Sequence, residues 1–167
     1  QEIEAAASID ILRRADIDVT VAGLNDVRVK GSHGLTVVAD KKIDEAGLDF
    51  DACVLPGGMP GATNLASSEK VKTLIRTMNQ KGKIIAAICA SPAVVLAPAG
   101  VLKNKSATCY PGMQSNFGKD TIYKEDNVVV DGNIITSRAP ATAFLFALTI
   151  VEQLAGREIR DKLSKAT

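Results

Sequence analysis

The chain has 167 residues, the usual size of one domain, and is long enough to close a hydrophobic core without disulfide bonds. Hydrophobic residues make up 46% of it and charged residues 23%, which excludes a disordered chain and a disulfide-stapled mini-protein. The net charge of +1 gives no electrostatic attraction toward nucleic acid or an anionic membrane surface. Small molecules and protein surfaces remain as the expected partners.

The cysteine and histidine content narrows the possible chemistry. Cys53, Cys89 and Cys109 cannot all pair within one chain, and their spacing matches no zinc pattern. The apolar stretches 84–100 and 139–155 are too short and too interrupted to span a membrane, and no signal peptide is recognisable. Reduced thiols in the cytoplasm are therefore expected. His33 is the only histidine, which excludes multi-histidine metal sites.

The predicted elements alternate between helix and strand. Helices are marked by apolar residues at helical spacing and strands by β-branched or continuous apolar runs. In chain order, we predict a helix over 2–15, strands over 19–22, 35–39 and 51–55, a helix over 69–80, a strand over 83–88, a helix over 91–97, short strands over 107–109, 122–123, 128–130 and 134–136, and helices over 140–154 and 157–165.

This alternation predicts the fold class. Strands joined by crossover helices form a mostly parallel sheet with helices on both faces, here a doubly wound α/β domain of flavodoxin-like layout. No repeat or linker divides the chain, so we expect one domain over 1–167. A doubly wound fold normally begins with a strand, whereas this sequence opens at Gln1 on a helix. We expect that the first strand is missing from the sequence.

Cys89 lies where a buried strand runs into a helix. Small neighbours, Ala87, Ala90 and Ser91, permit the sharp turn of a nucleophile elbow, which projects the side chain above the sheet. The N-terminus of the following helix favours a thiolate, so the pKa is expected below about 8.5. The alternative is a small buried hydrophobic residue at a strand end. Position alone leaves the two interpretations open.

The segment 55–62 follows another strand and contains the pair Gly57 and Gly58. Glycines past a strand end let backbone amides approach a ligand closely, so this loop can supply an oxyanion donor. It matches neither the phosphate-loop nor the dinucleotide-binding pattern. An ordinary tight turn is the alternative and, from the sequence alone, the favoured interpretation.

Few residues can assist the cysteine. His33 lies in a polar, glycine-flanked stretch that favours an exposed turn. Tyr110 can donate or accept a hydrogen bond but is no base at neutral pH. Glu4 shares the side of the opening helix that carries Ile3 and Ala7, although an ordinary solvated carboxylate is the favoured interpretation.

Several ordered motifs together resemble the ThiJ/PfpI family, and within it the Parkinson-disease protein deglycase branch. These motifs are Glu2-Ile3-Glu4, Arg13-Arg14-Ala15 with 19–23, Leu55-Pro56-Gly57-Gly58, Ala86-Ala87-Ile88-Cys89-Ala90 and Thr136-Ser137-Arg138-Ala139-Pro140. The similarity extends over nearly the whole chain. Family members begin with a strand upstream of the Glu-x-Glu helix, which agrees with the expectation of a missing strand.

The resemblance implies a set of site residues. Cys89 would be the reactive cysteine, and Glu4 the carboxyl group that contacts it and stays protonated to donate a hydrogen bond to the sulfur. Gly58 and Ala90 would supply the backbone amides that face a bound oxygen. Gly57, Tyr110 and the secondary thiol Cys109 would lie near the pocket, and Cys53 would be inert. Tyr110 replaces a histidine common in the branch, which weakens any peptidase activity.

The resemblance also implies a homodimer, with His33 at its interface, and a reaction without cofactor or metal. The leading hypothesis is a cytoplasmic glyoxalase or deglycase that acts on small aldehydes or glycated proteins. The alternative is a redox-responsive stress sensor or chaperone in which Cys89 is oxidised to sulfinate. A glutamine amidotransferase is set aside because it needs a histidine downstream of the cysteine, and His33 lies upstream.

Overall fold

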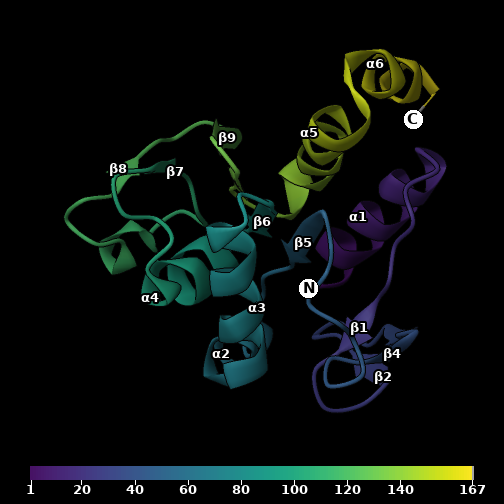
Figure 1. Cartoon of the computed structure of the whole chain (residues 1–167), viewed down its shortest axis with the longest axis horizontal. Helices are drawn as coiled ribbons and strands as arrows, with labels where there is room; N and C mark the ends of the chain where they lie inside the picture. The colour runs from purple at the N-terminus through teal and green to yellow at the C-terminus, as the bar shows by residue number, and fades with distance from the viewer. Residues whose placement is uncertain (167) are drawn as a thin grey trace.

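A four-stranded sheet forms the centre of the computed structural model, which describes residues 1–166 (Figure 1). Its strand order is β5 (Ala52–Leu55), β6 (Ile84–Ile88), β10 (Ile134–Ser137) and β9 (Val128–Asp131). β5, β6 and β10 pair in parallel, and only β9 runs antiparallel. The predicted α/β class with a mostly parallel sheet is confirmed.

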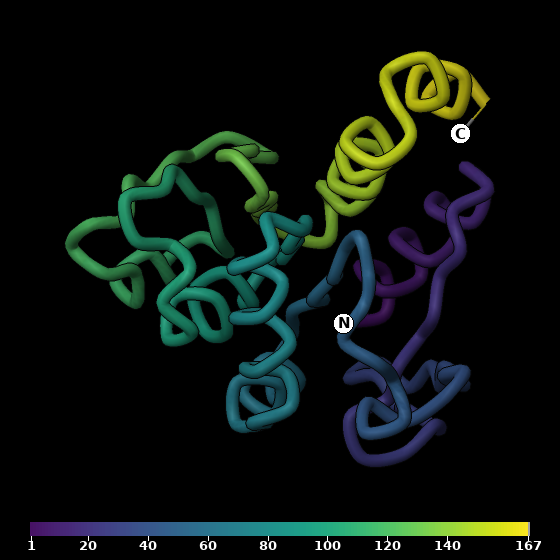
Figure 2. Tube along the Cα trace, viewed as in Figure 1, coloured from purple at the N-terminus to yellow at the C-terminus, as the bar shows by residue number. Residues whose placement is uncertain are grey.

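Helices flank this sheet in two groups (Figures 1 and 2). One group contains α1 (Glu2–Arg14), α5 (Ala143–Ala155) and α6 (Arg157–Ala166), in which α5 packs against both other helices. The other contains α2 (Gly61–Ser67), α3 (Glu69–Gln80), the π-helix η1 (Pro92–Leu96) and α4 (Ala97–Ala99). No helix within residues 1–166 is long and apolar enough to cross a membrane.

Three two-stranded pairs lie outside the central sheet. The parallel pairs are β1 (Ala22–Gly23) with β4 (Lys41–Lys42), and β7 (Ser106–Ala107) with β8 (Ile122–Tyr123). β2 (Arg28–Lys30) and β3 (Thr36–Val38) form an antiparallel hairpin. Two short 3₁₀ helices, η2 (Gln114–Asn116) and η3 (Pro140–Thr142), complete the elements described here.

Local structure departs from the prediction at several places. The strand expected over 19–22 is only two residues long, and the hairpin strand β2 lies in a stretch interpreted as a polar turn. Helix α2 was not predicted, because it begins after Pro60 without a side-chain cap. The helix expected over 91–97 opens as a π-helix: Pro98 has no N–H to continue an α-helical ladder, and Ala97 N–H donates to Pro92 O instead.

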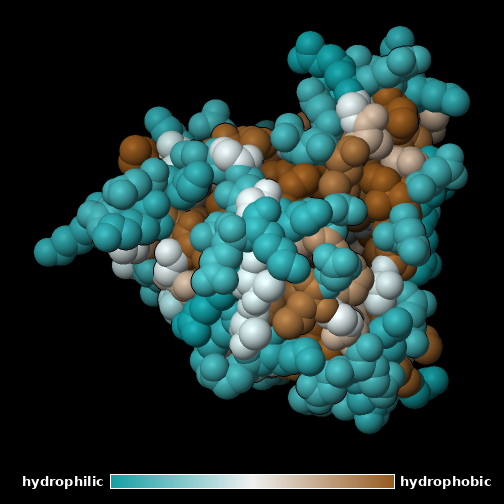
Figure 3. All heavy atoms as spheres, in the orientation of Figure 1, coloured by the Kyte–Doolittle hydropathy of each residue, from teal (hydrophilic) through white to brown (hydrophobic). Residues whose placement is uncertain are grey.

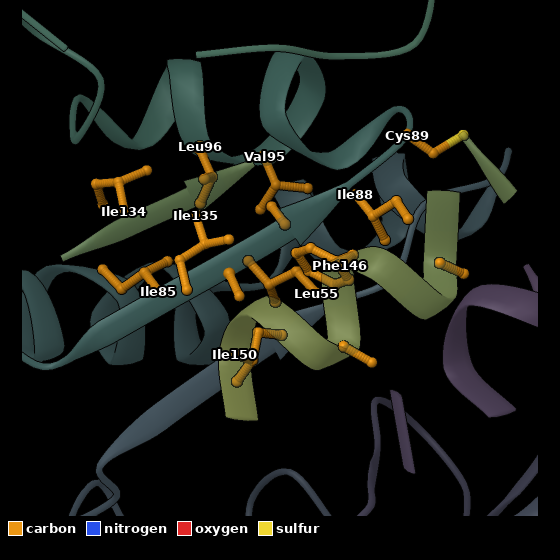
Figure 4. Packing of buried hydrophobic residues seen from close by; sticks show 14 of the residues in the cluster. Leu55, Ile85, Ile88, Cys89, Val95, Leu96, Ile134, Ile135, Phe146 and Ile150 are labelled. Atoms are coloured by element: carbon orange, nitrogen blue, oxygen red, sulfur yellow. The ribbon is translucent and has the colours of Figure 1, made fainter. Parts of the chain in front are cut away.

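The core is centred on β6, which is buried on both faces. Ile85, Ala86, Ala87 and Ile88 have no exposed surface, as expected for a strand between two helical layers. Phe146 on α5 packs beneath this strand (Figure 4). Burying one such side chain contributes about 1.5–3 kcal/mol, so the strand that carries Cys89 at its end is held rigidly.

Candidate active site

Cys89 stands at the carboxyl end of β6, and its sulfur points away from the aliphatic cluster (Figure 4). Its φ of 64° lies in the left-handed region, which is uncommon for a residue with a Cβ atom and typical of strained functional turns. The backbone is fixed from both sides: Cys89 N–H donates to Ser137 O at 2.9 Å, and Tyr110 N–H donates to Cys89 O at 2.7 Å. The residue is 7% exposed.

The loop after β5 passes directly over this elbow. A Cβ atom added at Gly57 would lie 2.7 Å from Cys89 Cβ and 2.8 Å from Ala90 N, so only glycine fits without displacement. Ser91, a fully buried residue, donates its hydroxyl to Pro56 O at 2.7 Å and joins the loop to the helix start. The loop after β5 and the residues that follow Cys89 are therefore fixed to each other.

Two backbone amides point at the Cys89 sulfur. They belong to Gly58 and Ala90, and each lowers the pKa of the thiol by hydrogen bonding. Gly58 reaches this orientation with a φ of 82°, which an L side chain rarely adopts. The amides have the arrangement of an oxyanion-binding site, in which preoriented donors face developing negative charge.

Glu4 completes the pocket from the first turn of α1. The residue is 0% exposed, and its Oε2 atom accepts a 2.7 Å hydrogen bond from Gly57 N–H. Its other oxygen, Oε1, is enclosed and has no hydrogen-bond partner among the described residues. The carboxylate also raises the pKa of the Cys89 thiol through its charge.

Gln1 fixes the helix that carries this glutamate. Its side-chain oxygen caps α1 by accepting from Glu4 N–H at 2.9 Å, and its α-ammonium group donates to Gly57 O at 2.8 Å. The N-terminus therefore lies beside the glycine loop, as Figure 2 shows. Neither Gln1 nor Ser91 was predicted as a site residue, and glutamine is not a preferred N-cap type that could have indicated it.

The pKa of the Cys89 thiol is raised to about 11, mainly by burial and then by the Glu4 carboxylate. Hydrogen bonds from the Gly58 and Ala90 amides act in the opposite direction and lower this pKa. This direction is opposite to the one expected from a helix N-terminus alone. The raising by Glu4 belongs to its carboxylate form, because a protonated carboxyl group carries no charge and donates a hydrogen bond.

The other two thiols are held in their neutral form. Cys109 is fully buried, and burial raises its pKa to about 11 against an opposing effect of the Arg138 charge. Burial alone raises the pKa of Cys53 in β5 to about 12. Tyr110 is 45% exposed, and the contact found with Cys89 is made by its backbone N–H.

His33 lies apart from the sulfur, in the turn between β2 and β3. Its side chain is 76% exposed, with Nδ1 3.3 Å from Glu2 Oε2. Its backbone N–H also donates to Glu2, which lowers the pKa of that carboxyl group. No group of three or more His, Cys, Asp or Glu side chains within residues 1–166 is arranged to hold a metal ion.

Comparison with known proteins gives a consistent result. Residues 1–153 match the DJ-1/PfpI family. The chain is 48% identical to Protein DJ-1 homolog B of Arabidopsis thaliana, a match that covers 100% of this chain and 38% of that protein. It is 37% identical to the glutathione-independent glyoxalase DJR-1.2 of Caenorhabditis elegans, covering 99% of this chain and 88% of that protein. The chain spans only 38% and 43% of two Arabidopsis relatives.

Solved structures share the fold over nearly all of this chain. The crystal structure of Drosophila melanogaster DJ-1beta superimposes with a TM-score of 0.95 at 44% identity, covering 99% of this chain and 90% of that one. The structure of oxidized Toxoplasma gondii DJ-1 superimposes with a TM-score of 0.93 at 40% identity, covering 99% and 91%. The flavodoxin-like layout expected from the sequence is therefore confirmed.

Proposed function

The chain belongs to the DJ-1/PfpI family, and from that premise we propose that it is a cofactor-free enzyme in which Cys89 attacks reactive carbonyl compounds. The observation that carries this proposal is the convergence of three groups on one sulfur: the Gly58 amide, the Ala90 amide and the Glu4 carboxyl group. A positioned acid–base group and two fixed donors are the equipment of nucleophilic catalysis on a carbonyl carbon.

The proposed reaction begins with methylglyoxal. As the Cys89 sulfur bonds to the aldehyde carbon, Glu4 takes the thiol proton and the carbonyl oxygen becomes an oxyanion facing the Gly58 and Ala90 amides. Glu4 returns this proton to that oxygen, which gives a hemithioacetal. Glu4 then moves a proton from the former aldehyde carbon to the adjacent ketone carbon while the hydroxyl proton passes to the ketone oxygen, which yields a lactoyl thioester. Water cleaves the thioester, releases lactate and restores the thiol, so no external oxidant or glutathione is consumed.

The relative named as a glutathione-independent glyoxalase supports this reaction class. The same attack on an aminocarbinol adduct would make the protein a deglycase, which is the finer possibility within this proposal. We place the reaction in the cytoplasm, where stress-generated aldehydes would be its substrates. Tyr110, exposed beside the elbow, and the buried Cys109 are proposed to border the substrate rather than to react with it.

We also propose that the chain forms a homodimer through the surface around His33. This exposed side chain has apolar neighbours in the same hairpin, where Val29, Leu35 and Val38 are exposed. Exposed apolar residues in one short segment are typical of protein contact surfaces. Sedimentation analysis of His33→Glu, Val38→Glu and wild-type chains tests this interface, and unchanged dimer mass in both variants would contradict it.

A second candidate function is a redox sensor in which Cys89 is oxidised to sulfinate. The observation in its favour is that the Gly58 and Ala90 amides could hold sulfinate oxygens as well as a substrate oxygen. A structural neighbour is described as oxidized, although that description concerns the Toxoplasma protein. Mass spectrometry after mild peroxide treatment separates the functions: selective addition of two oxygens to Cys89 with negligible turnover favours the sensor.

The direct test of the enzyme is lactate formation from methylglyoxal in the absence of glutathione. Cys89→Ser should reduce the rate to background, because the hydroxyl group is a much weaker nucleophile than the thiol. Cys53→Ser is the matched control, since that thiol lies in β5 and should leave turnover intact. Equal rates for wild type and Cys89→Ser would contradict the proposal.

A further inference from the structure

The hydroxyl group of Ser91 makes a tertiary contact. The residue stands at the N-terminal boundary of η1, where a serine side chain usually accepts a hydrogen bond from the helix backbone, but its side chain makes no such bond here. The hydroxyl group instead donates to Pro56 O at 2.7 Å, across 35 positions of sequence. Ser91 has no exposed surface, so its hydroxyl group is shielded from water. This hydroxyl group therefore serves the loop after β5 and not the helix that follows it.

The acceptor belongs to a peptide group that is hydrogen-bonded at both ends. The Pro56–Gly57 peptide bond is trans, so its C=O and N–H groups point in opposite directions. Its oxygen accepts from Ser91 Oγ at 2.7 Å, and its N–H donates to Glu4 Oε2 at 2.7 Å. One peptide group thus connects the serine on one side with the glutamate on the other.

Hydrogen bonds in such a chain strengthen one another. A donor at the carbonyl oxygen polarises the peptide group and makes its N–H a better donor, and the effect is larger in surroundings of low polarity. Hydrophobic residues reach the surface near the centre of the molecule in Figure 3, where β5 and the N-terminus lie in Figure 1. The Ser91 hydroxyl group therefore strengthens the hydrogen bond by which Gly57 N–H holds the Glu4 carboxyl group.

The two amides that face the reactive sulfur adjoin the ends of this bond. The Ala90 amide immediately precedes Ser91 in the chain. The Gly58 amide lies two residues after Pro56. A Cβ atom at Gly57 would lie 2.8 Å from Ala90 N, so the loop lies closely against the elbow. Glycines give a loop wide conformational freedom, and the hydrogen bond from the serine restricts it.

We propose that Ser91 is a positioning residue, which acts through the Pro56–Gly57 peptide group to hold the Glu4 carboxyl group and the two amides in place around the reactive sulfur. Apolar packing alone has no preferred direction, whereas a hydrogen bond to the peptide oxygen opposes rotation of the whole peptide group. The positional part of this inference stands on the contacts alone. Its effect on turnover rests on the proposed carbonyl chemistry.

Amide hydrogen exchange tests the positional part. Ser91→Ala removes the hydroxyl group with little change in volume, and should speed exchange at Gly57 about tenfold more than at Ile85 in β6. General destabilisation would instead speed both amides equally. Ser8→Ala is the matched control, because Ser8 is also buried and donates to Glu4 O within α1 at 2.8 Å; exchange at Gly57 should then match the wild type. Equal changes at Gly57 and Ile85 in Ser91→Ala, or none at either, would overturn the proposal.

Steady-state kinetics tests the consequence for turnover. Donors positioned for a transition state affect kcat more than substrate binding, so Ser91→Ala should lower kcat for methylglyoxal about tenfold and change KM by less than about twofold. Ser8→Ala should match the wild type in both constants. An unchanged kcat, or a loss confined to KM, in a Ser91→Ala variant with faster Gly57 exchange would overturn the inference. A wild-type protein without turnover would instead contradict the proposed function, and the exchange measurement would then decide this inference alone.

Discussion

Glu4 and Cys89 are 85 positions apart in the sequence and meet at one point: the glutamate in the first turn of α1 lies fully buried against the thiol at the end of β6. The Gly57 N–H holds one oxygen of that carboxyl group at 2.7 Å, so the group cannot turn away from the pocket. A buried carboxyl group costs free energy unless it is hydrogen-bonded, and this one is oriented by the loop that also covers the sulfur.

Replacing Glu4 with Gln should reduce turnover of methylglyoxal by about 100-fold or more, because the isosteric amide cannot carry the proton. Steady-state kinetics with the Cys89→Ser variant as the baseline measures the loss. Asp10→Asn is the matched control: Asp10 lies on the same helix, exposed and paired with Arg14, and should leave the rate unchanged. A fully active Glu4→Gln variant would mean that the carboxyl group has only a packing role.

Substituting Gly57 with Ala should destabilise the protein by about 1–3 kcal/mol, the usual cost of inserting a methyl group into a filled space. The added Cβ would meet Cys89 Cβ at 2.7 Å, so turnover should fall with stability. Gly61→Ala is the control, since nothing lies within 4 Å of an added Cβ there. Urea unfolding compares the two, and equal midpoints would show that the loop is free to move off the elbow.

Alkaline pH should destabilise the fold through its buried thiols. Burial raises the pKa of Cys109 to about 11 and of Cys53 to about 12, above the value of 9.0 for a free thiol. The folded state therefore binds these protons more tightly than the unfolded chain, and the resulting stability is complete below pH 9 and is lost as pH rises through 11 to 12. Urea midpoints measured from pH 8 to 11 should fall less steeply in Cys53→Ala. An identical slope would contradict this account.

The contact between Glu2 and the His33 turn should weaken in acid. The His33 backbone N–H lowers the pKa of Glu2, so the stabilisation is present above pH 4.5, the value of the free carboxyl group, and is lost as pH falls through the lowered value. Glu2→Gln should remove this acid dependence and speed hydrogen exchange at residues 31–34. Exchange rates that match the wild type at neutral pH would show that the turn is held by other contacts.

The fold could be predicted from the sequence because its buried strands are nearly continuous apolar runs. The segments 51–55 and 83–88 differ by only one residue from β5 and β6. The hairpin strand Arg28–Lys30 was missed because three residues with a single apolar side chain are too few to show an alternating pattern. The one-domain organisation over 1–167 remains a prediction.

The position of Cys89 could be predicted from its small neighbours, but the direction of its pKa shift could not. A helix N-terminus is a local feature, and it favours the thiolate. The opposing influences are burial in the folded core and the carboxylate of Glu4, which lies 85 positions away in sequence and is brought near only by folding. The direction of the pKa shift of Cys89 therefore depends on tertiary contacts, which the local sequence pattern does not contain.

The most direct measurement of the account is the pKa of the Cys89 thiol, followed by alkylation with iodoacetamide from pH 4 to 11 in Cys53→Ser backgrounds of wild type and Glu4→Gln. Because the Glu4 carboxylate raises the pKa of the Cys89 thiol, removing the carboxyl group must lower the midpoint by at least about one pKa unit. Midpoints that coincide in the two backgrounds would contradict the central claim that Glu4 controls the ionisation of Cys89.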